Sequence, residues 1–496
     1  MKRWAFLLTA GLLAGVLALP ALADDRLKVT GFIDTHMTLY SNVSPTDDNF
    51  TDGTALGCKA DGCDEDDSWH LRTRGRIFFN VAATENTKAV IAFEIDQAWG
   101  QNTGIPGTSA PGFDIAIDNT GVTELKQMYV DAKLPGLPVR LRAGGFYLIN
   151  TRLKQWILWG NDVAAVALDI DFHPQVKALV YFAPTQEDFD ELLAGGRLGE
   201  DYLTGVTLQT TPMKGLDVDF IVAFQHLQAP SFGGADGNVR VFPVAGLKSE
   251  DRWYLGVDAR WKMGNFSFDP TFIYAGGTRE FTAGADADIS AFLLDVRASY
   301  SIGPFTLTGK FVFNPGNEAT DDLGPGSDIN TFRTMGTDTV HKSSEWFQIL
   351  GWNLDTTSPP SFGFGDTRSI RVSSSFDQFG LIHGAVLGQY KATPKITLNG
   401  AVGFFSAAED VGRPARLGPA VASTAAGSNF NYTGEDKYIG TEIDLWVRYN
   451  IFPNTSIDVW FAHAFIGDAL NLRHPDTGLQ EAQDATAGGT RMIYRF

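Results

Sequence analysis

The chain has 496 residues, and its 39 lysines and arginines against 58 aspartates and glutamates give a formal net charge of −19. This acidity argues against DNA or RNA as a partner, because nucleic-acid binding needs a basic surface. The length would ordinarily predict several soluble domains, but it also suits one large barrel. Hydrophobic residues make up 44% of the chain and aromatic residues 12%, which fits strands that alternate apolar and polar positions.

The amino terminus has the pattern of a secretory leader. Lys2 and Arg3 precede an apolar run from Trp4 to Leu19, and Ala21-Leu-Ala23 forms a small-residue cleavage pattern. The run is short for a membrane-spanning helix, and no basic flank follows it. We therefore expect residues 1–23 to be a signal peptide and residues 24–496 to form a single exported domain.

The first segments of the mature chain alternate in polarity, as strands with one apolar face do. Strands are predicted at Arg26–Tyr40, Ser68–Ala82 and Lys88–Trp99. A long polar segment separates the first two strands, whereas a turn of a few residues joins the second and third. This alternation of short turns and long loops resembles bacterial porins, in which the turns are periplasmic and the loops extracellular.

Later hairpins repeat the pattern, because turns rich in Gly, Pro and Asn join alternating strands. The turns are Pro135-Gly-Leu-Pro138, Met263-Gly-Asn265, Gly303-Pro304 and Phe452-Pro-Asn454. Soluble sandwiches alternate as well, but long polar loops on only one side favour a membrane barrel.

The parity of the strands places a further hairpin in a doubtful region. Strands at Asp162–Asp171 and Val176–Phe182 bring every tight turn to the same end. The sequence thus predicts an all-β, transmembrane, antiparallel up-and-down β-barrel of about 18 strands, with 16 as the second choice. For Asn314–Phe376 we expect either a segment folded over or into the lumen or another hairpin.

The last ten residues form a strand with one apolar side. Phe496, Tyr494 and Met492 recur at every second position, with Arg495 and Arg491 opposite. A terminal aromatic-x-Phe strand resembles the closing strand of Gram-negative outer-membrane proteins, where pairing of the last strand with the first removes both sheet edges.

Two stretches are also similar to the alginate-export family of outer-membrane barrels. One is Tyr438-Ile-Gly-Thr-Glu-Ile-Asp-Leu445 followed by Phe465-Ile-Gly-Asp468, and the other is Met128-Tyr-Val-Asp131 with Arg140-Leu-Arg142. The similarity covers about a quarter of the chain, and the family's Gly-Arg-Gln is replaced here by Gly144-Gly-Phe146. The resemblance implies a channel for an anionic polysaccharide.

The two cysteines, Cys58 and Cys63, lie close together in a polar loop. Because exported proteins meet an oxidising environment, we expect them to form a disulfide. The acidic stretch Asp61–Asp67 could attract calcium but lacks the alternating ligand spacing of a calcium loop, so no metal site is assigned.

Charged side chains on inward strand faces are the candidate pore lining: His70, Arg72, Arg74 and Arg76 on one strand, Glu94 and Asp96 facing them, and Arg140 and Arg142 on another strand. An excess of arginine would favour anions. The alternative is that the carboxylates neutralise the arginines and the pairs only brace the wall. Inward placement follows because arginine at the lipid midplane costs roughly 2–4 kcal/mol.

The segment Asn150–Asn161, with Arg152, Lys154, Trp156 and Trp159, is the candidate constriction loop. It follows the predicted fifth strand, roughly where porin-like proteins fold a loop inward. The alternative is an extracellular cap whose tryptophans pack on the barrel rim.

These features together predict an outer-membrane porin of a Gram-negative bacterium, a water-filled channel for passive diffusion of ions and small hydrophilic solutes. Its expected contacts are membrane lipids, lipopolysaccharide and small or anionic solutes. A homotrimer is a possible oligomeric state. We expect no cofactor and no enzymatic activity, because no nucleophile, base and orienting group form a recognisable set. The alternatives are export or uptake of an anionic polysaccharide or oligosaccharide, and a scaffold barrel around a periplasmic or multihaem partner.

Overall fold

The computed structural model describes residues 26–41, 68–98, 123–154, 157–186, 201–228, 246–318, 321, 323–335, 345–351, 378–411, 436–470, 472–474, 478–480 and 484–496. The expected signal peptide (residues 1–23), the cysteine pair Cys58 and Cys63, and the acidic stretch Asp61–Asp67 lie outside these residues. All three therefore stay predictions.

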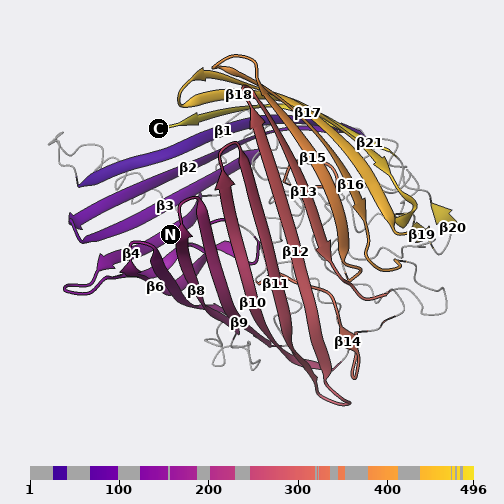
Figure 1. Cartoon of the computed structure of the whole chain (residues 1–496), viewed down its shortest axis with the longest axis horizontal. Coiled ribbons are helices and arrows are strands. Elements are labelled where there is room, and N and C mark those ends of the chain that lie inside the picture. Colours follow the sequence, from indigo (N-terminus) through magenta and orange to yellow (C-terminus); the bar gives the residue numbers. More distant parts are fainter. Residues whose placement is uncertain are drawn as a thin grey trace, which may run out of the picture.

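In the described part of the chain, 18 strands form one closed antiparallel barrel (Figure 1). They are β1 (Leu27–Ser41), β2 (Ser68–Thr84), β3 (Thr87–Ala98), β4 (Thr123–Lys133), β5 (Val139–Ile149), β6 (Gly160–His173), β7 (Val176–Gln186), β8 (Asp201–Met213), β9 (Leu216–Gln228), β10 (Leu247–Met263), β11 (Phe266–Phe281), β12 (Ala287–Ile302), β13 (Phe305–Asn314), β15 (Leu381–Lys391), β16 (Ile396–Ser406), β17 (Tyr438–Phe452), β18 (Thr455–Ile466) and β21 (Ala485–Arg495). The predicted fold class and the higher of the two strand counts are confirmed.

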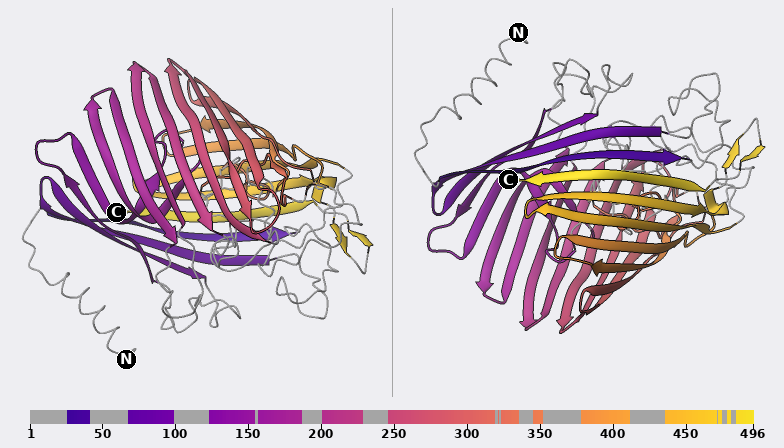
Figure 2. Two further views of the ribbon diagram at one scale, coloured as in Figure 1. Left: turned by 90° about the horizontal axis from the view of Figure 1, so that it is seen from below. Right: turned by 90° about the horizontal axis from the view of Figure 1, so that it is seen from above.

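The last strand closes the barrel against the first, as the terminal apolar pattern predicts. β21 pairs with β1 from Phe32↔Arg495 to Ser41↔Thr486. The backbone of Phe496 continues the ladder, donating to the carbonyl of Gly31 at 3.0 Å and accepting from its N–H at 2.9 Å. Figure 2 shows the yellow last strand lying beside the indigo first strand. Every described barrel strand therefore has two neighbours, and no sheet edge is left open.

Short turns gather at the end of the barrel where β1 begins and β21 ends, and we call this the turn end. The turn 85–86 joins β2 to β3, 264–265 joins β10 to β11, and 453–454 joins β17 to β18. Gly264 and Gly303 have positive φ values of 57° and 55°, which a two-residue hairpin turn requires. The opposite end carries the longer connections, although residues 282–286 between β11 and β12 are a short one.

The outward face of the strands is apolar and exposed, whereas the inward face is polar and buried. On β10 the outward Trp253, Leu255 and Val257 are 39%, 48% and 38% exposed, while the inward Tyr254 and Asp258 are fully buried. Period-two alternation produces this division, because successive side chains point to opposite sides of a strand. Lipid satisfies the outward face of such a barrel, so the inward face is the part that can hold a functional site.

The described residues of Asn314–Phe376 form no further hairpin of the barrel. It holds only β14 (Asp328–Ile329), which adds a parallel two-residue bridge to β12. Residues 345–351 run along the inside of the barrel and pack on it, so the first alternative for this stretch, a segment folded into the lumen, is the observed one. Near the closing strand lie a short 3-10 helix, Asp468–Leu470, and the small hairpin of β19 (Leu472–His474) and β20 (Gly478–Gln480). None of the described helices is long and apolar enough to cross a membrane.

Candidate functional site

The arginines of β2 meet the carboxylate of Glu94 on β3. The strand register places Arg76 opposite Glu94 and Arg74 opposite Asp96. Nε of Arg76 donates to Glu94 Oε2, and Nε of Arg74 lies 3.8 Å from the same oxygen. Arg72 is buried on the same face, and the side chains of His70 and Asp96 lie outside the described part of the structure.

Lys126 joins this cluster although the sequence pattern does not indicate it. A β-bulge between β3 and β4 pairs Ala92 with Gln127 but Phe93 with Leu125, so Lys126 is the extra residue. Its ammonium lies 3.3 Å from Glu94 Oε1 and 3.6 Å from Asp162 Oδ2. Simple alternation fails at a bulge, which is why inspection of the sequence missed this cation.

The cluster formed by Arg74, Arg76, Lys126, Glu94 and Asp162 is the β2–β4 patch. Among its described side chains it contains three cations and two carboxylates.

Arg140 and Arg142 do not reach the β2–β4 patch. Arg140 Nη1 donates to Asp131 Oδ1 at 2.7 Å, close to the turn end. Arg142 Nε donates to Asp169 Oδ2 at 2.9 Å, and its guanidinium lies 4.8 Å from the ring centroid of Phe146. The expected inward face of β5 is present, but its arginines have partners of their own.

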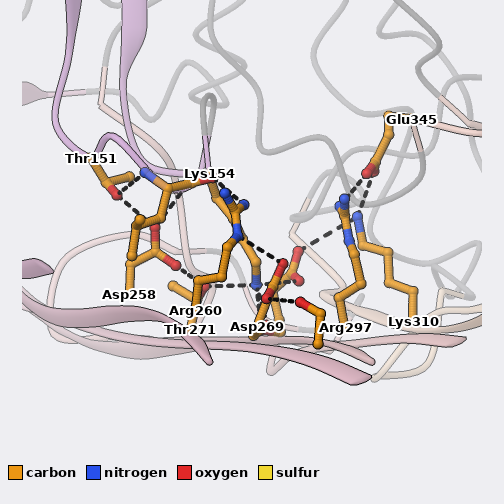
Figure 3. Close-up of polar contacts among 12 residues, drawn as sticks. Thr151, Lys154, Asp258, Arg260, Asp269, Thr271, Arg297, Lys310 and Glu345 are labelled. Atoms are coloured by element: carbon orange, nitrogen blue, oxygen red, sulfur yellow. Dashed lines mark hydrogen bonds and ion pairs between the residues drawn. The ribbon is translucent and has the colours of Figure 1, made fainter. Parts of the chain in front are cut away.

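The loop after β5 turns into the barrel, and we call its described residues 150–154 and 157–159 the inner loop (Figure 3). Thr151 Oγ1 lies 3.0 Å from Asp219 Oδ2 and 2.6 Å from Asp258 Oδ2. The side chain of Arg152 donates to Asp219 Oδ1 at 2.9 Å, and the N–H of Lys154 donates to Asp258 Oδ2 at 3.0 Å. Both aspartates are fully buried on the inward faces of β9 and β10. The inner loop thus lies inside the barrel rather than over its rim.

The ammonium of Lys154 fixes the inner loop to the next two strands of the wall, β11 and β12. Four oxygens of β11 and β12 lie within 2.9 Å of its Nζ: Thr271 Oγ1, Asp295 Oδ1, and the carbonyl oxygens of Asp269 and Asp295. A buried ammonium with this number of acceptors has its hydrogen-bonding capacity filled. Lys154 is therefore a structural anchor of the inner loop and is not open to a solute.

The apolar half of the inner loop packs on the wall. Ile157, Leu158 and Trp159 are buried in a cluster that includes Phe146 and Tyr254. The carbonyl of Leu158 also accepts the N–H of Met335 at 3.0 Å, which ties the inner loop to residues 323–335. Trp156 lies outside the described residues.

Residues 345–351, which we call the inner strap, begin at a second charged anchor. Lys310 Nζ donates to Glu345 Oε2 at 2.6 Å, Arg297 donates to Glu345 Oε1, and Lys310 also lies 3.6 Å from Asp295. Burial alone would raise the pKa of Glu345, but the charges of Lys310 and Arg297 lower that pKa to about 2. Through Asp295, the anchors of the inner loop and the inner strap form one continuous charge network (Figure 3).

Most arginines of the inner wall are more exposed than the carboxylates that they pair with. The side-chain exposures are 29% and 3% for Arg76 and Glu94, 44% and 5% for Arg140 and Asp131, 34% and 0% for Arg152 and Asp219, and 44% and 1% for Arg448 and Asp458. Arg142 and Asp169 are the reverse, at 21% and 43%. An arginine side chain extends beyond the short carboxylate at its base. Each pair is neutral as a whole, but the part of it that meets water is mainly the guanidinium group. The water-exposed layer of the wall is consequently richer in cations than in carboxylates.

A second cluster, which the sequence analysis did not single out, lies on β10 and β11 at the end away from the turn end. Glu250 accepts from Arg252 and Arg279 of the wall and from Arg333 of the segment 323–335. All three wall residues are buried. Alternation of side chains along β10 predicts that Glu250 and Arg252 point inward. Only the fold shows that Arg333 comes to Glu250.

No family model and no curated protein matches the chain. Among solved structures, a doubly substituted OccD1 (OprD) is similar over 95% of this chain and 95% of its own, with 11% identity and a TM-score of 0.50. OprD from Pseudomonas aeruginosa, an outer membrane protein, has 12% identity over 95% of this chain and 93% of its own, with a TM-score of 0.49. OccAB4 of Acinetobacter baumannii has 10% identity over 95% and 99%, also with a TM-score of 0.49. At such identities the likeness concerns the fold alone, which is a closed antiparallel β-barrel.

Proposed function

We propose that this protein is an outer-membrane porin of a Gram-negative bacterium, a passive channel for small hydrophilic solutes that prefers anions. The observation that carries the proposal is the layering of the inner wall, where guanidinium groups meet water and their carboxylate partners lie buried beneath them. In a narrow passage with low-dielectric walls, the outermost charges dominate the potential that a permeating ion meets. The proposal holds although the whole chain is strongly acidic.

The β2–β4 patch is the part of the wall that we assign to selectivity. The inner loop packs on the walls from β5 to β13, and the inner strap packs on the walls from β12 to β21. The hydrogen bonds and ion pairs described between the two segments and the barrel strands go to β7–β13 and to β17. Arg74, Arg76 and Lys126 lie on β2 and β4, so a solute that passes beside the two inner segments would meet them.

Reversal potentials in planar bilayers under a salt gradient test the anion preference. The variant R74Q/R76Q removes two positive charges from the β2–β4 patch. Arg72 is left in place because it is buried. We expect the permeability ratio of anion to cation to fall below that of the native chain, because the local field becomes less favourable to anions.

A matched control removes two positive charges away from the inner wall. Lys214 and Lys395 lie in turns at the turn end, so K214Q/K395Q alters the net charge equally without touching the β2–β4 patch. Equal selectivity in the native chain and in both variants would contradict the assignment. A correctly folded protein that never conducts would contradict the channel itself and favour the scaffold alternative.

The wall also supports a larger anionic solute as a second candidate. The rings of Tyr129 and Phe146 lie 5.5 Å apart beside the guanidinium of Arg142. The ring of Phe146 is buried, so it supports this arrangement from beneath, and a sugar ring with a carboxylate could contact the partly exposed Tyr129 and Arg142. Block of the current by anionic oligosaccharides, and not by neutral ones of equal size, would favour this solute class.

The turn end, where β1 begins and β21 ends, faces the periplasm in this proposal. A homotrimer remains a prediction, which chemical crosslinking in native membranes would test.

A further inference from the structure

The inner strap is held at its second half by two carboxyl groups of β17. Glu442 Oε1 accepts the backbone N–H groups of Gln348 and Ile349 at 2.8 and 2.7 Å, and Glu442 Oε2 accepts that of Leu350 at 2.6 Å. The N–H of Gln348 also lies 3.1 Å from Asp444 Oδ2. Three successive backbone donors thus form a concave anion site, and a side chain of the barrel wall fills it.

Glu442 and Asp444 stand on the same inward face of one strand and are 0% and 2% exposed. Because both accept the same N–H, their carboxyl groups are close neighbours. None of the described lysine, arginine or histidine side chains is paired with either group. Two buried carboxylates at such close range cannot both keep a charge without a cation, so the pair has to retain a proton.

We infer that Glu442 and Asp444 are positioning residues, a carboxyl pair that shares one proton, holds the inner strap on the barrel wall, and releases it on acidification. Glu442 faces three N–H donors and is the carboxylate, while Asp444, with one N–H partner and an unpartnered Oδ1, carries the proton. When a second proton enters the pair, an O–H replaces a charged acceptor in front of those donors. Hydrogen bonds to a charged acceptor are about twice as strong as neutral ones, so the strap loses about half of the strength of this anchor.

The groups around the pair leave few competing sources of pH dependence. Its cross-strand neighbours are Gly403 and Ala401 on β16 and Ala464 and Ala462 on β18. The nearby titratable groups are Arg448 further along β17, Asp458 on β18, Asp468 of the 3-10 helix, His383 beside Phe347 of the strap, and Glu345 at the start of the strap.

The first anchor of the strap responds to a different pH range. Glu345 keeps its pKa at about 2 because Lys310 and Arg297 outweigh the effect of burial. Mild acid therefore loosens only the half of the strap that Glu442 holds. Apolar packing of Phe347 and Leu350 on the wall keeps the strap close to the barrel in that state.

Amide hydrogen exchange of residues 345–351 tests this inference directly. The refolded full chain in detergent micelles is compared at about pH 7.5 and about pH 4.5, with exchange corrected for its intrinsic pH dependence. We expect protection of the Gln348, Ile349 and Leu350 amides to fall roughly ten-fold or more at the lower pH, since charge-assisted bonds are lost. Unchanged protection in the native chain would overturn the inference.

Two conservative variants separate the roles of the pair. In E442Q the amide NH₂ points at backbone N–H donors, so the strap amides should be weakly protected at both pH values. In D444N the amide can donate to Glu442 in place of the shared proton, so protection should persist at neutral pH and the acid transition should move to lower pH. Native-like protection in E442Q, or a transition in D444N that does not move, would contradict the inference.

Asp458→Asn is the matched control, because Asp458 pairs with Arg448 on the same wall and makes no contact with the strap among the described residues. It should leave strap exchange unchanged. The consequence for conduction rests on the proposed channel function: the single-channel current of the native protein should change between the two pH values, and that of E442Q should not. Exchange needs no conduction, so a failed channel and a failed positioning pair give different results.

Discussion

The ring of Phe347 fills the space that a side chain at Gly403 would need. A Cβ atom placed on Gly403 would lie 2.5 Å from Cζ and 2.6 Å from Cε2 of that ring. Real Cβ contacts are not that short, so glycine at this position of β16 is what lets the inner strap lie flat on the wall. A strand interior otherwise disfavours glycine.

Gly403→Ala should therefore displace the inner strap. Overpacking of this kind costs about 1–3 kcal/mol of unfolding free energy, and denaturant unfolding followed by tryptophan fluorescence would measure it. Gly384 is the matched control, because a Cβ there meets nothing within 4 Å. An equal loss in Gly384→Ala would contradict this explanation, because no ring lies beside Gly384.

Lys154→Met should destabilise the barrel strongly. The substitution removes one of the cations that lie beside the carboxylate of Asp295, and it leaves the carbonyl oxygens of Asp269 and Asp295 without the donor Nζ. Removal of one partner from a buried pair costs about 3–5 kcal/mol. Lys177→Met breaks the exposed pair with Asp171 and should cost below about 1 kcal/mol. Similar unfolding midpoints for the two variants would refute a buried anchor at Lys154.

Stability should depend on Glu345 in a pH-dependent way whose sign follows from its lowered pKa. The folded-state pKa of about 2 lies below the ordinary value of 4.5, so the ionised group stabilises the fold above the ordinary pKa. That contribution disappears as the pH falls from about 4.5 toward about 2. Glu345→Gln should thus be less stable than the native chain at neutral pH and equally stable near pH 2.

Denaturant midpoints measured across this range would reveal the convergence. A constant difference between Glu345→Gln and the native chain down to the lowest pH would mean that the ion pairs with Lys310 and Arg297 do not contribute. Glu280→Gln, at an exposed pair with Lys248, is a suitable comparison.

Barrel closure should depend on the buried pair between Asp34 of β1 and Arg491 of β21. The guanidinium makes three contacts of 2.6 to 3.0 Å with the carboxylate. Either single substitution leaves a buried charge alone and should lower the fraction of folded, heat-modifiable protein on gels. The double variant D34L/R491M should recover much of it, since well-packed apolar groups often replace a buried pair without loss.

The amino-acid sequence by itself determines the strands, their inward and outward faces, the short turns and the closing strand. These features depend on local alternation and on turn residues, which the sequence displays directly: Trp253 and Tyr254 lie on opposite faces of β10, as their positions predict. The inward side of β2 likewise follows from the cost of arginine in lipid.

Only the tertiary structure decides which charges meet. Arg140 pairs with Asp131 and Arg142 with Asp169 because the strand register, which no local pattern reveals, places them together. Lys126 enters the lumen through a bulge, and the inner loop and inner strap lie on walls distant in sequence. The contacts of the inner loop with β9 to β12 and of the inner strap with β17 join residues about 70 to 140 positions apart, so they exist only once the strands between them have assembled into the barrel.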